Sequence, residues 1–178
     1  MARVIPNERT WIGFTETRPA NPAAPTEAEI DDAIDLTCLV MSINASAQGN
    51  TVPTPSLCSL FETSVPGTSQ ATFSGDFYRD DAKGTDGKIM DIAWNLLPRG
   101  KSGYFFISRF GGTGDDHKPR AGESVEVWPV QITSRQAGAL SSNTAQTFTS
   151  NAAVNENPWE SAIVVKSAVS ASSVSTGK

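Results

Sequence analysis

The chain has 178 residues and a formal net charge of −5. This length suits a single domain, which buries about 70% of its unfolded surface and needs no disulfide to form a core. The negative net charge and the lack of a run of basic residues argue against nucleic-acid binding. No apolar run approaches the roughly 20 residues of a membrane span. The N-terminus has no signal-peptide pattern, so we expect folding in a cytoplasm with Cys38 and Cys58 as free thiols.

The first half of the chain predicts strands and one short helix. Thr26 followed by acidic residues is typical of a helix N-cap, and it predicts a helix from 27 to about 34. Val65-Pro66-Gly67 predicts a turn. Alternating apolar residues predict strands at 10–16, 36–45, 57–63 and 68–79.

A polar stretch at 46–55 separates two of these strands. It contains Gly49-Asn50 and two prolines, and it is too long for a tight hairpin. Long loops inside compact domains usually have a function. We therefore predict a functional loop here.

The clearest helix signal runs from 86 to 97. Lys88, Asp91 and Asn95 fall in one narrow sector at about 100° per residue, and apolar side chains fill the remaining arc of about 200°. That arc is wider than one sheet can cover. A second surface is therefore expected against it, either a loop of the same chain or a neighbouring subunit.

The second half predicts strands at 103–110, 124–135 and 145–154. The apolar phase changes at Trp128-Pro129, which predicts a bulge or a sheet corner. Together the elements predict a mainly β fold, a sandwich or partial barrel of two packed sheets with one flanking helix. We assign residues 1–165 to a single domain with an N-terminal arm, and the Ser- and Ala-rich residues 166–178 to a disordered tail.

Residues that could carry chemistry are sparse. His117, the single histidine, lies in a Gly-rich turn and is interpreted as a solvated loop residue. The three His and Cys residues are too widely spread for a zinc site, and the acids between 76 and 91 lack the EF-hand order. We therefore expect no catalytic residue, no metal site and no cofactor.

Four tryptophans allow two interpretations. Trp94 and Trp128 follow core patterns, whereas Trp11 and Trp159 lie near the chain ends, where aromatic residues often anchor a terminal arm. Exposed aromatic side chains could instead stack on sugars, but they are enriched at protein interfaces generally. A carbohydrate- or host-binding sandwich is thus the alternative to an assembling protein, and a hydrolase using carboxylates is the weakest of the three hypotheses.

Five segments, in this order, resemble the major tail tube proteins of long, non-contractile phage tails. The resemblance covers residues 3–165, and the order of the segments carries it rather than any single one. The segments are PTEAEI at 25–30, DLT at 35–37, LCSLFETSVPG at 57–67, DFYRD at 76–80 and KPRAGE at 118–123.

The resemblance implies a virion structural protein that is not an enzyme. Six copies would close into a ring, and the inner sheets would join into one barrel around a lumen. Rings would stack through a long loop and the terminal arms, assembling in the host cytoplasm. The expected partners are further copies of the chain, the tape-measure protein, tail tip and terminator proteins, and phage DNA in transit, with no membrane binding.

On this basis we assign candidate site residues. The inter-ring loop comprises Ser46, Gln48, Asn50, Thr51, Val52 and Pro53. The inter-subunit helix face comprises Ile89, Met90, Ala93, Trp94 and Leu97. Trp11 and Trp159 are the terminal arm anchors, and the lumen-facing acids, which would repel DNA phosphate, are Glu62, Asp76 and Glu126.

Overall fold

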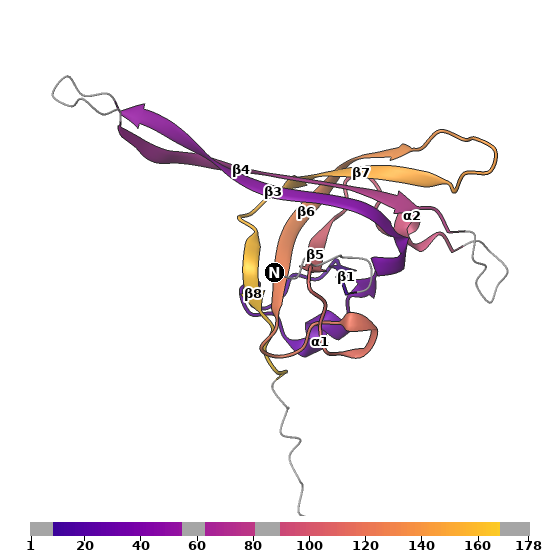
Figure 1. Ribbon diagram of the computed structural model, residues 1–178, viewed down its shortest axis with the longest axis horizontal. Coiled ribbons are helices and arrows are strands. Elements are labelled where there is room, and N and C mark those ends of the chain that lie inside the picture. The colour runs from indigo at the N-terminus through magenta and orange to yellow at the C-terminus, as the bar shows by residue number, and fades with distance from the viewer. Residues whose placement is uncertain (1–8, 55–62, 81–89, 168–178) are drawn as a thin grey trace, which may run out of the picture.

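The computed structural model describes residues 9–54, 63–80 and 90–167 (Figure 1). Strands dominate these residues, and the helices are short. The elements are β1 (Trp11–Thr15), α1 (Glu27–Asp31), β2 (Ile34–Asp35), the 3-10 turn η2 (Thr37–Leu39), β3 (Val40–Thr54), β4 (Thr63–Tyr78), α2 (Ile92–Leu96), β5 (Ser102–Ser108), the 3-10 turn η3 (Asp115–His117), β6 (Ser124–Ala137), β7 (Thr147–Val154) and β8 (Trp159–Ile163).

All eight strands belong to one antiparallel sheet in the order β2-β1-β5-β6-β7-β4-β3, with β8 pairing β6 off this path. Strand β6 joins the two halves of the sheet. One of its edges pairs with β5, while the other pairs first with β8 and then with β7. Figure 1 shows β3, β4 and β7 crossing over β5 and β1. The mainly β fold is confirmed, but its two packed layers are halves of a single sheet.

Two apolar clusters form the core. The larger cluster lies between the two halves of the sheet and contains Phe14, Phe73, Phe105, Trp128 and Phe148. The smaller cluster lies under α1 on the other face of β1, β5 and β6. Aromatic contacts tie the larger cluster together, since the Phe105 ring stacks on Phe73 with centroids 4.6 Å apart.

The phase change in β6 reflects these two clusters. Val125 and Val127 face the smaller cluster, whereas Trp128 and Val130 face the larger one. Successive side chains of a strand point to opposite faces, so a strand that is buried on one face and then on the other shows this pattern. The sequence predicted a bulge or a sheet corner at Trp128-Pro129. No bulge lies there, because both residues keep regular register with β5, so the sheet corner is the alternative that remains. Pro129 lies where the neighbour on the other edge changes from β8 to β7.

Helix α1 begins as predicted at its N-cap. The Thr26 hydroxyl accepts a hydrogen bond from the Glu29 backbone N–H, and the Glu29 carboxylate accepts one from the Thr26 N–H at 2.8 Å. This reciprocal capping box satisfies donors that a helix start leaves open. The helix ends at Asp31, and buried Ile30 attaches it to the smaller cluster.

Several other elements differ from their predicted extents. Helix α2 starts at Ile92, and its N-cap Asp91 has a positive φ of 37°, while 86–89 lie outside the described residues. Strand β8 was missed, because its sequence lacks a clear alternation. Residues 57–62 of a predicted strand and most of the predicted tail also lie outside the described residues.

Candidate assembly surfaces

The most exposed feature of the fold is a two-stranded arm, defined here as residues 46–54 of β3 and 63–71 of β4. The two strands pair from Ala47↔Ala71 outward to Thr54↔Thr63. Strand β7 pairs with β4 only from Thr72 onward. Within the arm, β3 is therefore the only described strand that pairs with β4. In Figure 1 the arm extends away from the rest of the molecule, which we call the body.

The arm corrects the predictions of a loop at 46–55, of which residue 55 lies outside the described residues, and of a turn at 65–67. The candidate loop residues Ser46, Gln48, Asn50, Thr51, Val52 and Pro53 all lie in β3. Prolines and glycines suggested a break in the strand, but a two-stranded ribbon has an open edge on each side. Pro53 and Pro66 therefore fit it, because a missing N–H on an open edge breaks no ladder hydrogen bond.

The arm is polar but carries no charge. None of residues 40–54 or 63–75 is Asp, Glu, Lys, Arg or His. Every described side chain from Gln48 to Thr54 and from Thr63 to Gln70 is exposed. Val52 and Val65 lie opposite each other across the two strands, each 48% exposed. Natural edge strands are usually protected by charged side chains, so an uncharged double edge is typical of a surface that pairs with another chain.

A polar face covers the outer side of β3, β4 and β7. Asp76 accepts hydrogen bonds there from Thr149 at 2.6 Å and from Ser42 at 2.7 Å. These two hydrogen bonds, that from Thr149 foremost, lower the pKa of Asp76. The side chain of Asp76 therefore stays ionised at neutral pH, on a face otherwise rich in hydroxyl and amide groups.

Of the other two predicted lumen acids, the structure describes only Glu126, which does not share the polar face of Asp76. Glu62 lies outside the described residues. Glu126 pairs with Ile107 and shares the face of Trp128, toward the larger cluster, whereas Asp76 lies on the opposite face from Phe77. Glu126 is bound by both Arg109 Nε and Nη2 and accepts a hydrogen bond from Trp128 Nε1 at 3.0 Å. Alternation along β6 puts Glu126 on the face toward the larger cluster and away from Asp76. Its role as a lumen acid stays a prediction.

The predicted inter-subunit face of α2 is largely internal. Ala93 and Leu97 are buried in the larger cluster of their own chain, because α2 is short and lies against the sheet. Trp94 is half-buried between the guanidinium groups of Arg79 and Arg135, at 3.9 and 3.7 Å from its ring centroid. Met90 is exposed but precedes the helix. Ile89 lies outside the described residues.

Trp11 and Trp159, the two predicted anchors of the terminal arm, lie at the same apolar cluster. Trp11 is fully buried in the smaller cluster, and Trp159 packs partly buried against the same cluster. Trp11 is therefore a core residue of β1, and its role as an anchor of the terminal arm stays a prediction. Its burial also removes it from any sugar-stacking surface, which weakens the carbohydrate-binding alternative.

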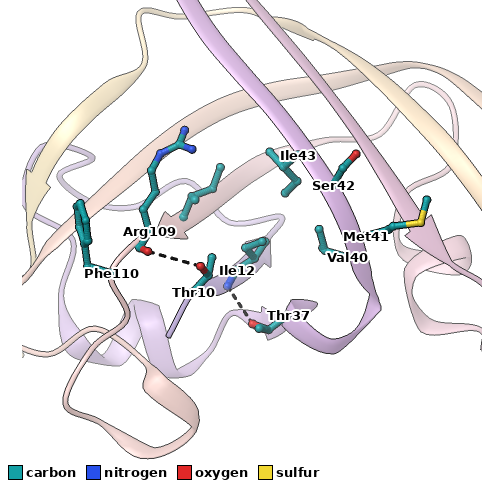
Figure 2. A pocket seen from close by; sticks show the side chains of 10 residues that line it. Thr10, Ile12, Thr37, Val40, Met41, Ser42, Ile43, Arg109 and Phe110 are labelled. Atoms are coloured by element: carbon teal, nitrogen blue, oxygen red, sulfur yellow. Dashed lines mark hydrogen bonds between the residues drawn. The ribbon is translucent and has the colours of Figure 1, made fainter. Parts of the chain in front are cut away.

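A groove of about 670 Å³ lies where the two ends of the sheet approach each other (Figure 2). It separates the start of β3 from β1 and the end of β5. Its apolar lining consists of Ile12, Val40, Met41, Ile43, Ile107 and Phe110. No sequence pattern indicated it, since three separate parts of the chain form it only in the folded state.

A β-bulge shapes one side of this groove. Val40 pairs with Phe77 and Ser42 pairs with Asp76, so Met41 has no partner on β4. Bulges re-aim side chains, and Met41 is 51% exposed at the rim. Arg109 and the 70% exposed Phe110 lie at the opposite side (Figure 2). The charge of Arg109 is compensated by Glu126, so the groove is mainly apolar.

The described residues contain no cluster of His, Cys, Asp or Glu that could hold a metal ion. Nor do they include a helix long and apolar enough to cross a membrane. Within the part of the chain that the structure describes, the exposed features are thus surfaces: an uncharged arm, a polar sheet face and an apolar groove.

Comparison with known proteins agrees with this description. The family model described as phage tail tube protein matches residues 1–167. The chain therefore belongs to the phage tail tube protein family. It is a structural component of phage-like virions and not an enzyme.

Solved structures share the fold at low sequence identity. A chain from the tail of an empty gene transfer agent particle, refined helically with C6 symmetry, aligns with a TM-score of 0.54 at 17% identity, covering 88% of this chain and 97% of that one. A chain from the sheath/tube terminator of the PVC extracellular contractile injection system aligns at 0.52 with 12% identity, covering 88% and 96%. A comparison with curated proteins found no match.

Proposed function

We propose that this protein forms rings that stack into the hollow tube of a phage-like tail. The uncharged arm is the observation that carries the proposal. An isolated two-stranded hairpin is marginal in water, and its open edges invite pairing with another chain. Every described side chain from Gln48 to Thr54 and from Thr63 to Gln70 is exposed, so a neighbouring copy is the partner that would cover the arm.

Six copies per ring are favoured by the C6 symmetry of the gene transfer agent tail that shares the fold. The free edge of β3 within the body, at residues 40–45, is uncharged and supplies the side-by-side contact. A closed ring removes such an edge, as closure does in barrels generally. The arm then reaches the next ring, in the role first assigned to a loop.

The polar face of β3, β4 and β7 is our candidate for the lumen wall. It presents hydroxyl and amide groups together with the ionised Asp76. A wall with one negative charge per subunit repels phosphate and does not trap DNA in transit. The tape-measure, tail tip and terminator proteins remain the expected partners inside and at the ends of the tube.

Deletion of the arm tests this function. Ala47 and Ala71 lie directly opposite each other, so residues 48–70 can be replaced by Asn-Gly, which favours a two-residue hairpin turn. We expect a folded subunit with native circular dichroism that forms no stacked tubes in negative-stain electron microscopy. Wild-type protein at the same high concentration should form hollow tubes.

Two results would contradict the proposal. A wild-type protein that stays monomeric under all concentrations and salt conditions would refute tube formation itself. Normal tubes from the deletion variant would leave tube formation intact and show that the arm is not the stacking element.

A further inference from the structure

We propose that the apolar groove between β3 and the β1–β5 pair receives the arm of a second copy of this chain. Val52 and Val65 would be the inserted side chains. The proposal rests on the proposed function, since it names the surface that a stacking arm contacts. It assigns a role to a groove that the ring and lumen assignments leave unused.

Two bulky apolar side chains of the arm lie on one face. Val52 and Val65 are cross-strand partners and so share that face, whereas the neighbouring Pro53 and Pro66 alternate to the other face. Gly67 helps to shape this face, because a Cβ at that position would lie 3.1 Å from Val52 Cγ2. An exposed apolar pair on an uncharged ribbon gains from burial in a matching surface.

The groove has the matching character. Its lining is mainly apolar, with Thr10, Thr37 and Ser42 as uncharged polar residues. Its one cation is already paired with Glu126, and Met41 and Phe110 border it as exposed apolar side chains. An arm without charges can enter the groove without burying an unpaired charge, which would cost free energy. A charged segment would lack a free counter-charge among the described lining residues.

The arm cannot fill the groove of its own chain. Ile43 and Val52 lie on the same continuous strand, about 30 Å apart at about 3.3 Å per residue. Figure 1 shows this strand extending outward rather than folding back. The occupant must therefore come from another copy. A contact between different surfaces of identical chains is heterologous, and it propagates into rings or filaments.

The experiment uses two variants, one that blocks the arm and one that blocks the groove. The arm variant carries Val52→Asp and Val65→Asp, and the groove variant carries Met41→Asp and Phe110→Asp. All four positions are exposed, and native circular dichroism and an unchanged Tm establish that both variants fold. Val52→Thr and Met41→Leu serve as conservative controls and should keep tube formation.

We expect neither blocked variant alone to form stacked tubes in negative-stain electron microscopy, because only the contact between rings is blocked. Mixed in equal amounts, the two variants should form particles larger than either gives alone by light scattering, through the intact groove of one and the intact arm of the other. A mixture no larger than its separate components, or a groove variant that forms normal tubes, would overturn the docking site. Failure of the wild type to form tubes would refute the proposed function separately.

Disulfide trapping gives a second readout. In a background with Cys38→Ser and Cys58→Ser, a Val52→Cys chain is mixed with a Met41→Cys chain and oxidised mildly. We expect the mixed disulfide to exceed both homodimers by at least about tenfold, which corresponds to about 1.4 kcal/mol. Products near the 1:2:1 ratio of random pairing, from tubes of normal appearance, would show that the arm contacts another surface.

Discussion

In the body, aromatic side chains fill the space between two halves of one sheet, whereas no described side chain of the arm is buried. Both regions use the same antiparallel pairing, and β3 and β4 run through both. The sheet curls, so the apolar side chains of the body pack against one another. The side chains of the arm are left exposed and would be covered by other copies of the chain. The stability of the subunit and its capacity to assemble therefore depend on different residues.

This contrast can be tested first at its strongest point, Phe105. The side chain is fully buried and contacts both Phe14 and Phe73 across the sheet halves. Replacing it with Ala leaves a cavity, so Phe105→Ala should lower the free energy of unfolding by about 3–5 kcal/mol in chemical denaturation.

The matched control is Phe110→Ala at the groove rim. Phe110 is the same residue type but largely exposed, so the free energy of unfolding should change by less than about 0.5 kcal/mol. Equal losses for the two variants would mean that the groove rim is as much a part of the core as the space between the sheet halves.

A middle-sized effect is expected at the capping box of α1. Loss of an N-cap side chain costs about 1 kcal/mol, so Thr26→Ala should lower the stability of the body by that amount. Thermal unfolding measures the loss. Thr26→Ser, which retains the hydroxyl, is the control, and a loss of similar size from Ser would argue against the hydrogen bond as the cause.

The same capping box gives the body a pH dependence. Burial raises the pKa of Glu29, but hydrogen bonds from the backbone of Thr26 and Ala20 outweigh it and hold the pKa below its ordinary value. A lowered pKa stabilises the fold above the unfolded value of about 4.3, and this stability is lost as pH falls through the lower folded value. Glu29→Gln should flatten the stability profile between pH 5 and pH 3, and an unchanged slope would exclude Glu29 as its source.

The capping box was predictable because it depends on four adjacent residues. The phase change in β6 was also visible in the sequence, since each half of the strand is buried on a different face. The arm was not, because Pro53 and Pro66 indicate a break in any strand whose edges are both paired. Only the pairing partners show that these edges are open.

The candidate surfaces were predicted less well for a related reason. The apolar arc of 86–97 suggested an outer contact, but Ala93 and Leu97 are covered by the same chain. The groove depends on β1, β3 and β5 meeting in space, and Met41 reaches its rim only through a bulge. Such features are long-range, and local periodicity does not encode them.

The smallest effect is expected at the far end of the arm. Thr54 and Thr63 join the two strands there through hydroxyl–carbonyl hydrogen bonds of 3.0 and 3.1 Å. Both residues are exposed, so water replaces these bonds at little cost, and Thr54→Ala should change the free energy of unfolding by less than about 0.5 kcal/mol. Denaturation of the monomer measures this change. A loss above about 1 kcal/mol would mean that the arm folds cooperatively with the body, and the separation between stability and assembly would no longer hold.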